Sequence, residues 1–204
     1  MQYSLAVPDP EEPKTAAVTS RAAVVATLAL AGAVLVMALV LQCSGDDAPA
    51  GGPVSEGMVA PDFELVSLDG ERVALSDFAG RPVMINFWAS WCPPCRDEFP
   101  VLAEARAEHL DAGFEILGVT RNDGEEYSRR FVEDSGAAWP MLPDTDSVAW
   151  RAYGAIGLPT SYFVDAEGIV QRFHIGPLNY DQLANHLAAI GLGAQVGEGG
   201  GDTT

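Results

Sequence analysis

Residues 83–100 read VMINFWASWCPPCRDEFP, and two cysteines stand in this stretch where one structural pattern gives way to another. Residues 82–88 form a continuous apolar run of strand length, as expected for a sheet strand that is covered on both faces. Residues 94–110 then read as a helix, with one stripe at helical spacing made of Phe99, Leu102, Arg106 and Leu110. The stretch therefore predicts a buried strand, a turn and a helix, with Cys92 and Cys95 where the helix begins.

The Cys92-Pro93-Pro94-Cys95 motif suits reversible disulfide chemistry. In the first turn of a helix, side chains three residues apart lie near each other, so a disulfide can close without backbone movement. The helix N-terminus presents unpaired N–H groups and the positive end of the helix dipole, which favour a thiolate at Cys92. We therefore predict that Cys92 is the exposed attacking thiolate and that Cys95 is the resolving thiol that releases the substrate.

Other uses of a cysteine pair fit this sequence less well. A zinc site would need two more ligands, but Cys43 lies far along the chain and the three histidines follow no pairing pattern. Haem attachment requires a histidine after the second cysteine, where this chain has Arg96. A purely structural disulfide that closes so small a loop would restrict the unfolded chain only a little. We expect neither a metal ion nor a cofactor.

Further strands and helices are expected on both sides of this stretch. Asp69-Gly70 is a hairpin dipeptide between two strand-like runs. In the helix expected at residues 125–133, Tyr127, Phe131 and Val132 should face inward. The strands are expected at residues 63–68, 71–75, 114–120, 160–164 and 169–175, and the helices at residues 125–133, 147–153 and 180–190. This order predicts an α/β, thioredoxin-like fold with an N-terminal β-hairpin and a mixed central sheet flanked by helices.

A long apolar run lies near the start of the chain. Residues 22–41 carry no charge, and twenty helical residues cover roughly the 30 Å hydrocarbon core of a bilayer. Lys14 and Arg21 precede the run, and no Lys or Arg follows it until Arg72, so the positive-inside rule places the N-terminus in the cytoplasm. We expect a single-pass anchor in the cytoplasmic membrane with an extracytoplasmic catalytic domain. A cleaved signal peptide, or a lipid on Cys43, would export the domain as well.

Composition completes the predicted organisation. The net charge of -18 argues against nucleic acid as a partner, because phosphate binding requires clustered Lys and Arg. Segments rich in Gly, Pro and acidic residues flank the globular part. The predicted parts are a cytoplasmic tail at residues 1–21, a transmembrane anchor at 22–42, a flexible linker at 43–57, a thioredoxin-like domain at 58–192 and a disordered tail at 193–204.

Residues 83–100 closely resemble the active-site region of the TlpA-like membrane-anchored thioredoxins, which include the extracytoplasmic reductases of cytochrome c maturation. The resemblance extends to Ala60-Pro-Asp-Phe63, Gly157-Leu-Pro-Thr-Ser161 and Phe163-Val-Asp165, and so covers nearly all of residues 58–190. It implies protein disulfides as substrates, those of apocytochrome c among them, and a membrane thiol-transfer protein as the electron donor.

The same resemblance implies a second loop at the site. Gly157-Leu158-Pro159-Thr160 is similar to the family's cis-proline loop, which faces the two cysteines. A cis bond before Pro159 would expose backbone groups that can pair with an extended substrate segment. Trp91 is expected to form an apolar rim beside Cys92, whereas Trp88 is expected in the core. The predicted substrate-binding residues are Trp91, Pro93, Pro94, Leu158, Pro159 and Thr160.

Asn86 marks a difference from thioredoxin, which is similar in this strand but has a buried aspartate there that assists proton transfer to the inner cysteine. Asparagine cannot titrate. TlpA-like proteins carry a glutamate three residues after the second cysteine, where this chain has Glu98. Partial burial would raise the pKa of this carboxyl above about 4.3. We predict that Glu98 moves the proton of Cys95; the alternative is an exposed helix glutamate.

Three alternative functions remain open from the sequence. An enzyme that donates disulfides would use the same residues in reverse. Ala60-Pro-Asp-Phe63 and Leu75-Ser-Asp-Phe78 also resemble peroxiredoxins, although Ala89 stands where those proteins have a threonine that orients the peroxide. A copper-handling thioredoxin-like module would add a third ligand to the two thiolates, for which His174 is the candidate.

Overall fold

A computed structural model of the chain describes residues 53–193. The predicted cytoplasmic tail, the predicted anchor, most of the predicted linker and nearly all of the predicted C-terminal tail lie outside the described residues. Within residues 53–193, no helix combines the length and the apolar character needed to cross a bilayer.

A five-stranded mixed sheet forms the centre of the domain, in the order β5-β4-β3-β6-β7. β3 runs parallel to β4, and β4 runs parallel to β5. β6 runs antiparallel to both β3 and β7. The strands are β3 (Val83–Trp88), β4 (Glu115–Thr120), β5 (Met141–Pro143), β6 (Thr160–Val164) and β7 (Val170–Ile175). The predicted mixed central sheet is confirmed.

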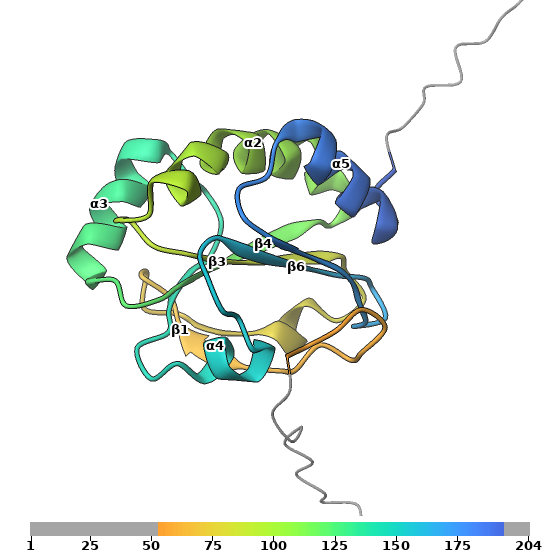
Figure 1. Ribbon diagram of the computed structural model, residues 1–204, viewed down its shortest axis with the longest axis horizontal. Coiled ribbons are helices and arrows are strands. Elements are labelled where there is room, and N and C mark those ends of the chain that lie inside the picture. Colours follow the sequence, from red (N-terminus) through yellow and green to blue (C-terminus); the bar gives the residue numbers. More distant parts are fainter. Residues whose placement is uncertain (1–52, 194–204) are drawn as a thin grey trace, which may run out of the picture. The chain divides into compact units, whose positions relative to one another are not determined.

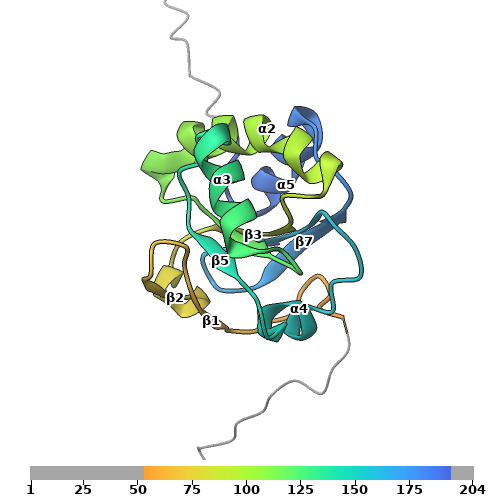
Figure 2. The same cartoon turned by 90° about the vertical axis from the view of Figure 1, so that its left-hand side faces the viewer.

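Helices cover both faces of this sheet (Figures 1 and 2). The helices are α2 (Pro93–His109), α3 (Glu125–Ser135), α4 (Val148–Tyr153) and α5 (Tyr180–Ala189), with short 3-10 turns at η1 (Leu75–Phe78) and η2 (Leu110–Ala112). α2, α3 and α5 lie on one side, while α4 and the antiparallel hairpin of β1 (Glu64–Val66) and β2 (Arg72–Ala74) lie on the other. The predicted N-terminal β-hairpin is therefore confirmed.

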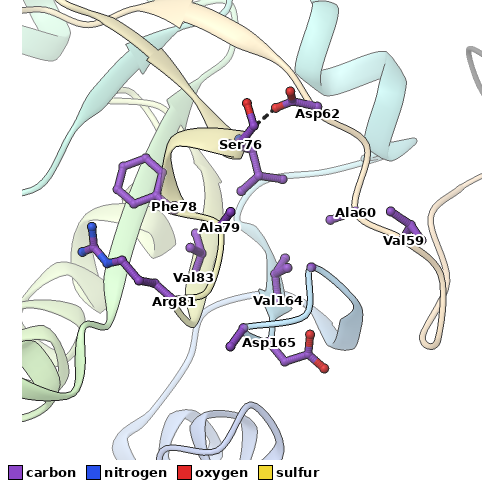
Figure 3. Close-up of a pocket in the computed structure, with 13 residues that line it drawn as sticks. Val59, Ala60, Asp62, Ser76, Phe78, Ala79, Arg81, Val83, Val164 and Asp165 are labelled. Atoms are coloured by element: carbon purple, nitrogen blue, oxygen red, sulfur yellow. Dashed lines mark hydrogen bonds between the residues drawn. The ribbon is translucent and has the colours of Figure 1, made fainter. Parts of the chain in front are cut away.

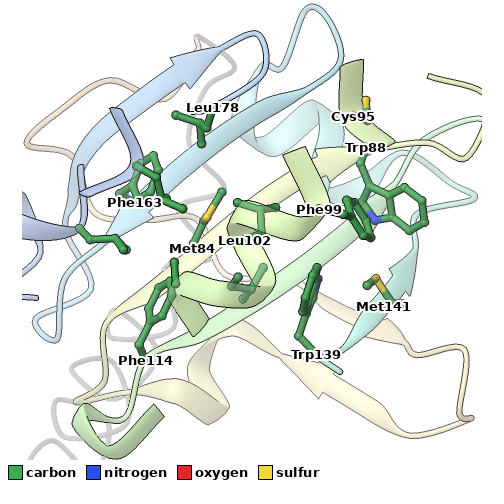
Figure 4. Packing of buried hydrophobic residues seen from close by; sticks show 14 of the residues in the cluster. Met84, Trp88, Cys95, Phe99, Leu102, Phe114, Trp139, Met141, Phe163 and Leu178 are labelled. Atoms are coloured by element: carbon green, nitrogen blue, oxygen red, sulfur yellow. The ribbon is translucent and has the colours of Figure 1, made fainter. Parts of the chain in front are cut away.

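The side chains of β3 alternate between two hydrophobic cores, which explains its continuous apolar run. Met84 and Trp88 join the core beneath α2 and α5, here called the α2 face (Figure 4). Ile85 and Phe87 join the core beneath α4, here called the α4 face. Trp88 is fully buried, so its predicted place in the core is confirmed.

Three local predictions are wrong. β5 was not expected, because its three residues end in Pro143 and are too few to show a periodicity. Tyr127 does not face inward: its side chain is 66% exposed, while Phe131 and Val132 pack against the α2 face. Arg106 is not part of an apolar stripe, since its Nε lies 2.5 Å from Glu115 Oε1 in a half-buried ion pair.

Candidate active site

Cys92 and Cys95 form a disulfide at the first turn of α2, with an S–S distance of 2.04 Å and 5.3 Å between the Cα atoms. Cys92 is the N-cap residue, and its Sγ accepts a hydrogen bond from the Cys95 N–H at 3.3 Å. Pro93 and Pro94 occupy the first helical positions, where a missing N–H removes no intrahelical bond. The disulfide therefore lies at the positive end of the α2 helix dipole.

Both sulfur atoms are shielded in the disulfide form. Cys92 is only 5% exposed and Cys95 is fully buried, while the exposed thiolate predicted at Cys92 belongs to the reduced form and stays a prediction. The bond to Cys95 holds the Cys92 sulfur inward, and both cysteines belong to the core of the α2 face. Trp91, which is 59% exposed, and Pro93 are exposed on either side of Cys92.

Glu98 lies one helical turn beyond Cys95 and is 1% exposed, which excludes an exposed helix glutamate. Its Oε1 accepts a hydrogen bond from Asn86 Nδ2 at 2.9 Å, and its Oε2 accepts one from the Leu178 N–H at 2.9 Å. Burial raises the pKa of this carboxyl from 4.5 to about 7, and the two hydrogen bonds oppose the rise. Near neutral pH, Glu98 can therefore take up or release a proton.

Asn86 links Glu98 to the sheet. Its Nδ2 also donates to Ser161 Oγ at 3.0 Å, and the two residues are direct partners in the β3–β6 register. Asn86 Oδ1 is buried and has no hydrogen-bond partner within the part of the chain that the structure describes. Sequence reasoning identified Asn86 but missed Ser161, although Ser161 stands in the Gly157–Ser161 stretch. The Leu178 N–H left no signal in the sequence, because any residue except proline supplies that group.

The proline loop lies at the same end of the sheet as the cysteines. The Leu158–Pro159 peptide bond is cis, as the resemblance implied. Thr160 pairs with Phe87 near the end of β3, and its hydroxyl donates to the Gly157 carbonyl at 2.8 Å. Leu158 packs against the cluster that holds both cysteines. Ile156, which sequence reasoning missed, precedes this loop with 81% of its side chain exposed.

The loop that follows β4 holds the segment just before Cys92, and sequence reasoning missed this loop too. The Asp123 carboxylate accepts hydrogen bonds from the Ser90 N–H at 2.7 Å and the Ser90 hydroxyl at 2.8 Å. It also accepts one from the Ser128 hydroxyl of α3 at 2.7 Å. The indole N–H of Trp91 donates to the Asn122 carbonyl at 3.0 Å. These contacts tie the redox turn to the start of α3.

The structure brings together two histidines that the sequence left unpaired. The rings of His174, on β7, and His186, on α5, have centroids 5.4 Å apart. Burial lowers the pKa of His186, and the nearby His174 and Arg172 lower it further. Among residues 53–193, no three His, Cys, Asp or Glu side chains are grouped as ligands for a metal ion.

A separate apolar hollow of about 170 Å³ lies at the opposite end of β3 from the cysteines (Figure 3). Val83, the first residue of β3, and Val164, the last of β6, line it together with Phe78. Asp62 at its edge accepts a hydrogen bond from the Ser76 N–H at 3.1 Å. None of the predicted site residues lines this hollow.

Known proteins share both the sequence and the fold. Residues 57–173 match the AhpC/TSA family. The thiol-disulfide oxidoreductase ResA of Bacillus subtilis (strain 168) is 33% identical over 144 residues, which cover 71% of this chain and 80% of that protein. The thioredoxin-like protein YneN of the same strain is 32% identical over 136 residues, or 66% of this chain and 79% of YneN.

Solved structures of thiol–disulfide oxidoreductases share the fold of this chain. The thioredoxin domain of a thiol-disulfide oxidoreductase from Bacteroides vulgatus has a TM-score of 0.61 and 30% identity, covering 66% of this chain and 96% of that domain. A thiol:disulfide interchange protein from Chlorobium tepidum has a TM-score of 0.61 and 28% identity, covering 67% of this chain and 97% of its own. With a closed cysteine pair on the first turn of α2, the chain belongs to the AhpC/TSA family and, within it, to the ResA-type thioredoxin-like thiol–disulfide oxidoreductases.

Proposed function

We propose that this oxidoreductase reduces disulfides of protein substrates outside the cytoplasmic membrane, with apocytochrome c as a substrate and a membrane thiol-transfer protein as electron donor. The observation that carries the proposal is a buried carboxyl with a pKa of about 7, one helical turn inside a closed cysteine pair. Such a group can exchange a proton with the inner cysteine at neutral pH. The resemblance to the TlpA-like group supports the choice of substrate and donor.

The reaction begins with the reduced pair. The Cys92 thiolate attacks one sulfur of the substrate disulfide, so a mixed disulfide forms and the other substrate sulfur leaves as a thiolate that takes up a proton. The Cys95 thiol then loses its proton and attacks the Cys92 sulfur. This step closes the Cys92–Cys95 bond seen here and releases the second substrate sulfur. Two electrons have passed to the substrate, and a dithiol donor must return them by the same exchange.

Glu98 has a defined part in the second step. Its carboxylate accepts the proton of Cys95, directly or through a water molecule, as the thiolate forms. Burial favours the protonated carboxyl that results, and the hydrogen bonds from Asn86 and Leu178 hold the carboxyl in one orientation. When the donor reduces the pair, the proton returns to Cys95.

The six proposed substrate-binding residues differ in how they can act. Trp91 and Pro93 are exposed, and Pro94 and Leu158 are half-buried, so their side chains can touch a bound polypeptide. Pro159 and Thr160 are buried. We assign them to holding the loop, with the backbone before Pro159 offered to an extended substrate segment.

The reduction potential of the purified chain tests the direction of electron flow. Thiols are trapped and counted across a graded thiol–disulfide buffer. A value near thioredoxin's, about −270 mV, or lower supports a reductase. A value near about −120 mV would make the protein a disulfide donor and overturn the cytochrome c proposal. Peroxide reduction is not proposed, because the position three residues before Cys92 is the buried, apolar Ala89.

The location is tested with a membrane-impermeant maleimide on intact cells after mild reduction. In a Cys43→Ser background, labelling at Cys92 is expected if residues 22–42 anchor an extracytoplasmic domain. A Cys92→Ser, Cys43→Ser variant controls for labelling elsewhere. Labelling that appears only after the cells are lysed would contradict the proposed location.

A further inference from the structure

A groove of about 560 Å³ runs beside the redox turn, between that turn and α3. Its lining includes Trp91, which precedes Cys92, and Arg96, which follows Cys95. Tyr127, Arg130 and Phe131 of α3 form the opposite side. Because a protein disulfide must reach the Cys92 sulfur, the polypeptide around that disulfide has to cover surface next to this turn.

Two aromatic rings at the groove are exposed, and a hydrogen bond holds one of them, Trp91, in place. The Trp91 indole N–H donates to the Asn122 carbonyl at 3.0 Å, while the side chain is 59% exposed. The Tyr127 ring lies over Gly124, where a Cβ atom would come within 2.9 Å of Tyr127 Cδ2. Aromatic rings offer a large apolar contact at a low cost in conformational entropy, and the cost is lower still for a ring that is already held, as Trp91 is.

The groove also holds positive charge on an otherwise acidic chain, which has 11 Lys and Arg against 29 Asp and Glu. The Arg96 guanidinium lies 5.1 Å from the centroid of the Phe131 ring and has no ion-pair partner among residues 53–193. Within the described part of the chain, Arg130 pairs with Glu126 alone, at 3.4 Å, and both side chains are largely exposed. Both guanidinium groups are therefore available to a ligand.

Two carboxylates line the same groove, and their contacts give them different roles. Asp123 accepts three hydrogen bonds, from Ser90 and Ser128, and so serves to hold the walls together. Asp134 stands near the end of α3 and is the acidic group that a ligand would meet there. The bonds from Ser90 also fix the distance between the groove and the redox turn, so a bound segment is positioned relative to Cys92.

We infer that this groove binds the substrate polypeptide next to its target disulfide, and that it prefers a segment with an acidic side chain beside an aromatic one. The inference rests on the proposed use of protein substrates and adds a sequence preference to it. The carboxylate pairs with Arg130 and Arg96, and the aromatic ring packs between Trp91 and Tyr127.

The test uses the full-length chain and two peptides with the same internal disulfide. One carries Asp-Phe beside the disulfide, and the other carries Lys-Phe. The measured rate is that of peptide reduction by the reduced chain or, if that reaction does not proceed, of peptide oxidation by the disulfide form. Each rate is divided by the rate of the same variant with a small non-peptide disulfide. Wild type is expected to favour the Asp-Phe peptide by about three- to tenfold, a preference that shrinks at high salt.

Arg130→Glu is expected to abolish or invert this preference. Arg151→Glu is the matched control, because it makes the same charge change on α4, on the other side of the sheet, and should leave the ratio unchanged. Tyr127→Ser should slow both peptides relative to wild type. Equal effects of the two arginine variants, or no peptide preference in wild type, would overturn the inference. An oxidising potential would overturn the proposed reductase but would leave this preference measurable.

Discussion

The two faces of the sheet bury polar groups in different ways. On the α4 face, the Tyr153 hydroxyl donates to the Pro61 carbonyl and the Tyr162 hydroxyl donates to the Tyr153 carbonyl, each at 2.9 Å. On the α2 face, Asn86, Ser161 and the carboxyl of Glu98 form a buried hydrogen-bonded set. The two tyrosine hydroxyls donate to backbone carbonyls, whereas Glu98 has a pKa of about 7 and can gain or lose a proton near neutral pH. The carboxyl with the shifted pKa thus lies on the same face of the sheet as the cysteines.

The largest expected effect is on the α2 face. Cys92→Ser should reduce exchange with protein disulfides to the uncatalysed background, because no nucleophile remains at the turn. Cys95→Ser should instead accumulate a mixed disulfide between Cys92 and the substrate, which mass spectrometry detects. Cys43→Ser serves as the control and should keep full exchange activity. Release of substrate from Cys95→Ser at the wild-type rate would contradict the assigned roles.

A pair of phenylalanine variants compares the two cores directly. Phe87 packs against Trp150, Tyr153 and Tyr162 on the α4 face, with ring centroids about 6 Å apart. Phe99 packs against Trp88, Phe131 and Trp139 on the α2 face. Each Phe→Ala change should lower the free energy of unfolding by about 3–5 kcal/mol. Denaturant titration measures this loss.

The two variants should differ in redox chemistry. Phe87→Ala should leave the reduction potential and the pKa of Glu98 unchanged, since its cavity opens away from the cysteines. Phe99 is the residue after Glu98, and its removal should admit water and bring that pKa back towards 4.5. If both variants shifted the potential equally, the two faces would not be independent.

Glu98→Gln should change how stability depends on pH. Below pH 4.5 the carboxyl is protonated whether the chain is folded or not, and between 4.5 and about 7 only the folded chain keeps the proton. The stability that this group contributes is therefore present below 4.5 and is lost as the pH rises through 7. The loss is about 3 kcal/mol for the disulfide form.

The glutamine variant cannot titrate at this position and does not undergo this loss. Its unfolding free energy should therefore rise relative to that of wild type by that amount between pH 4.5 and about 7. Denaturant titrations at several pH values measure it. The same variant should flatten the pH dependence of exchange near neutrality. An unchanged pH profile of both stability and exchange would remove Glu98 from the proton pathway.

Tyr153→Phe should give the smallest effect. It removes one hydroxyl from the α4 face and leaves the Pro61 carbonyl without that donor, which costs about 1 kcal/mol. Because burial raises the pKa of Tyr153 well above its usual value, the hydroxyl stays neutral, and the loss should be the same from pH 4.5 to 7. A loss that varied with pH in this window would contradict this prediction.

The sequence predicted what depends on local pattern. The apolar runs of β3 and β4, the Asp69-Gly70 hairpin and the helix start at the cysteines can all be recognised within a few residues. β5 was missed because an edge strand of three residues shows no periodicity. The prediction of which α3 side chains face inward was partly wrong, because Tyr127 packs on Gly124, a contact that spacing alone does not indicate.

The candidate site was predictable as a set of residues but not as a network. Cys92, Cys95 and Glu98 follow from one helical turn and a family resemblance. The hydrogen bonds from Asn86 to Ser161 and from Leu178 to Glu98 join residues 75 and 80 positions apart, so they depend on strand register and loop path. The same holds for the contact of His174 with His186, which requires β7 and α5 to lie side by side.

The β3–β6 register also determines how far apart the two halves of the site are. Because Cys92 follows β3 and Pro159 precedes β6, the pairing of Phe87 with Thr160 fixes both loops at one end of the ladder. A slip of one residue would turn Ser161 away from Asn86, and a slip of two would move Pro159 by about 7 Å along the strand. The spacing that a substrate meets is therefore set by the backbone pairing of two central strands, and not by contacts between the two loops.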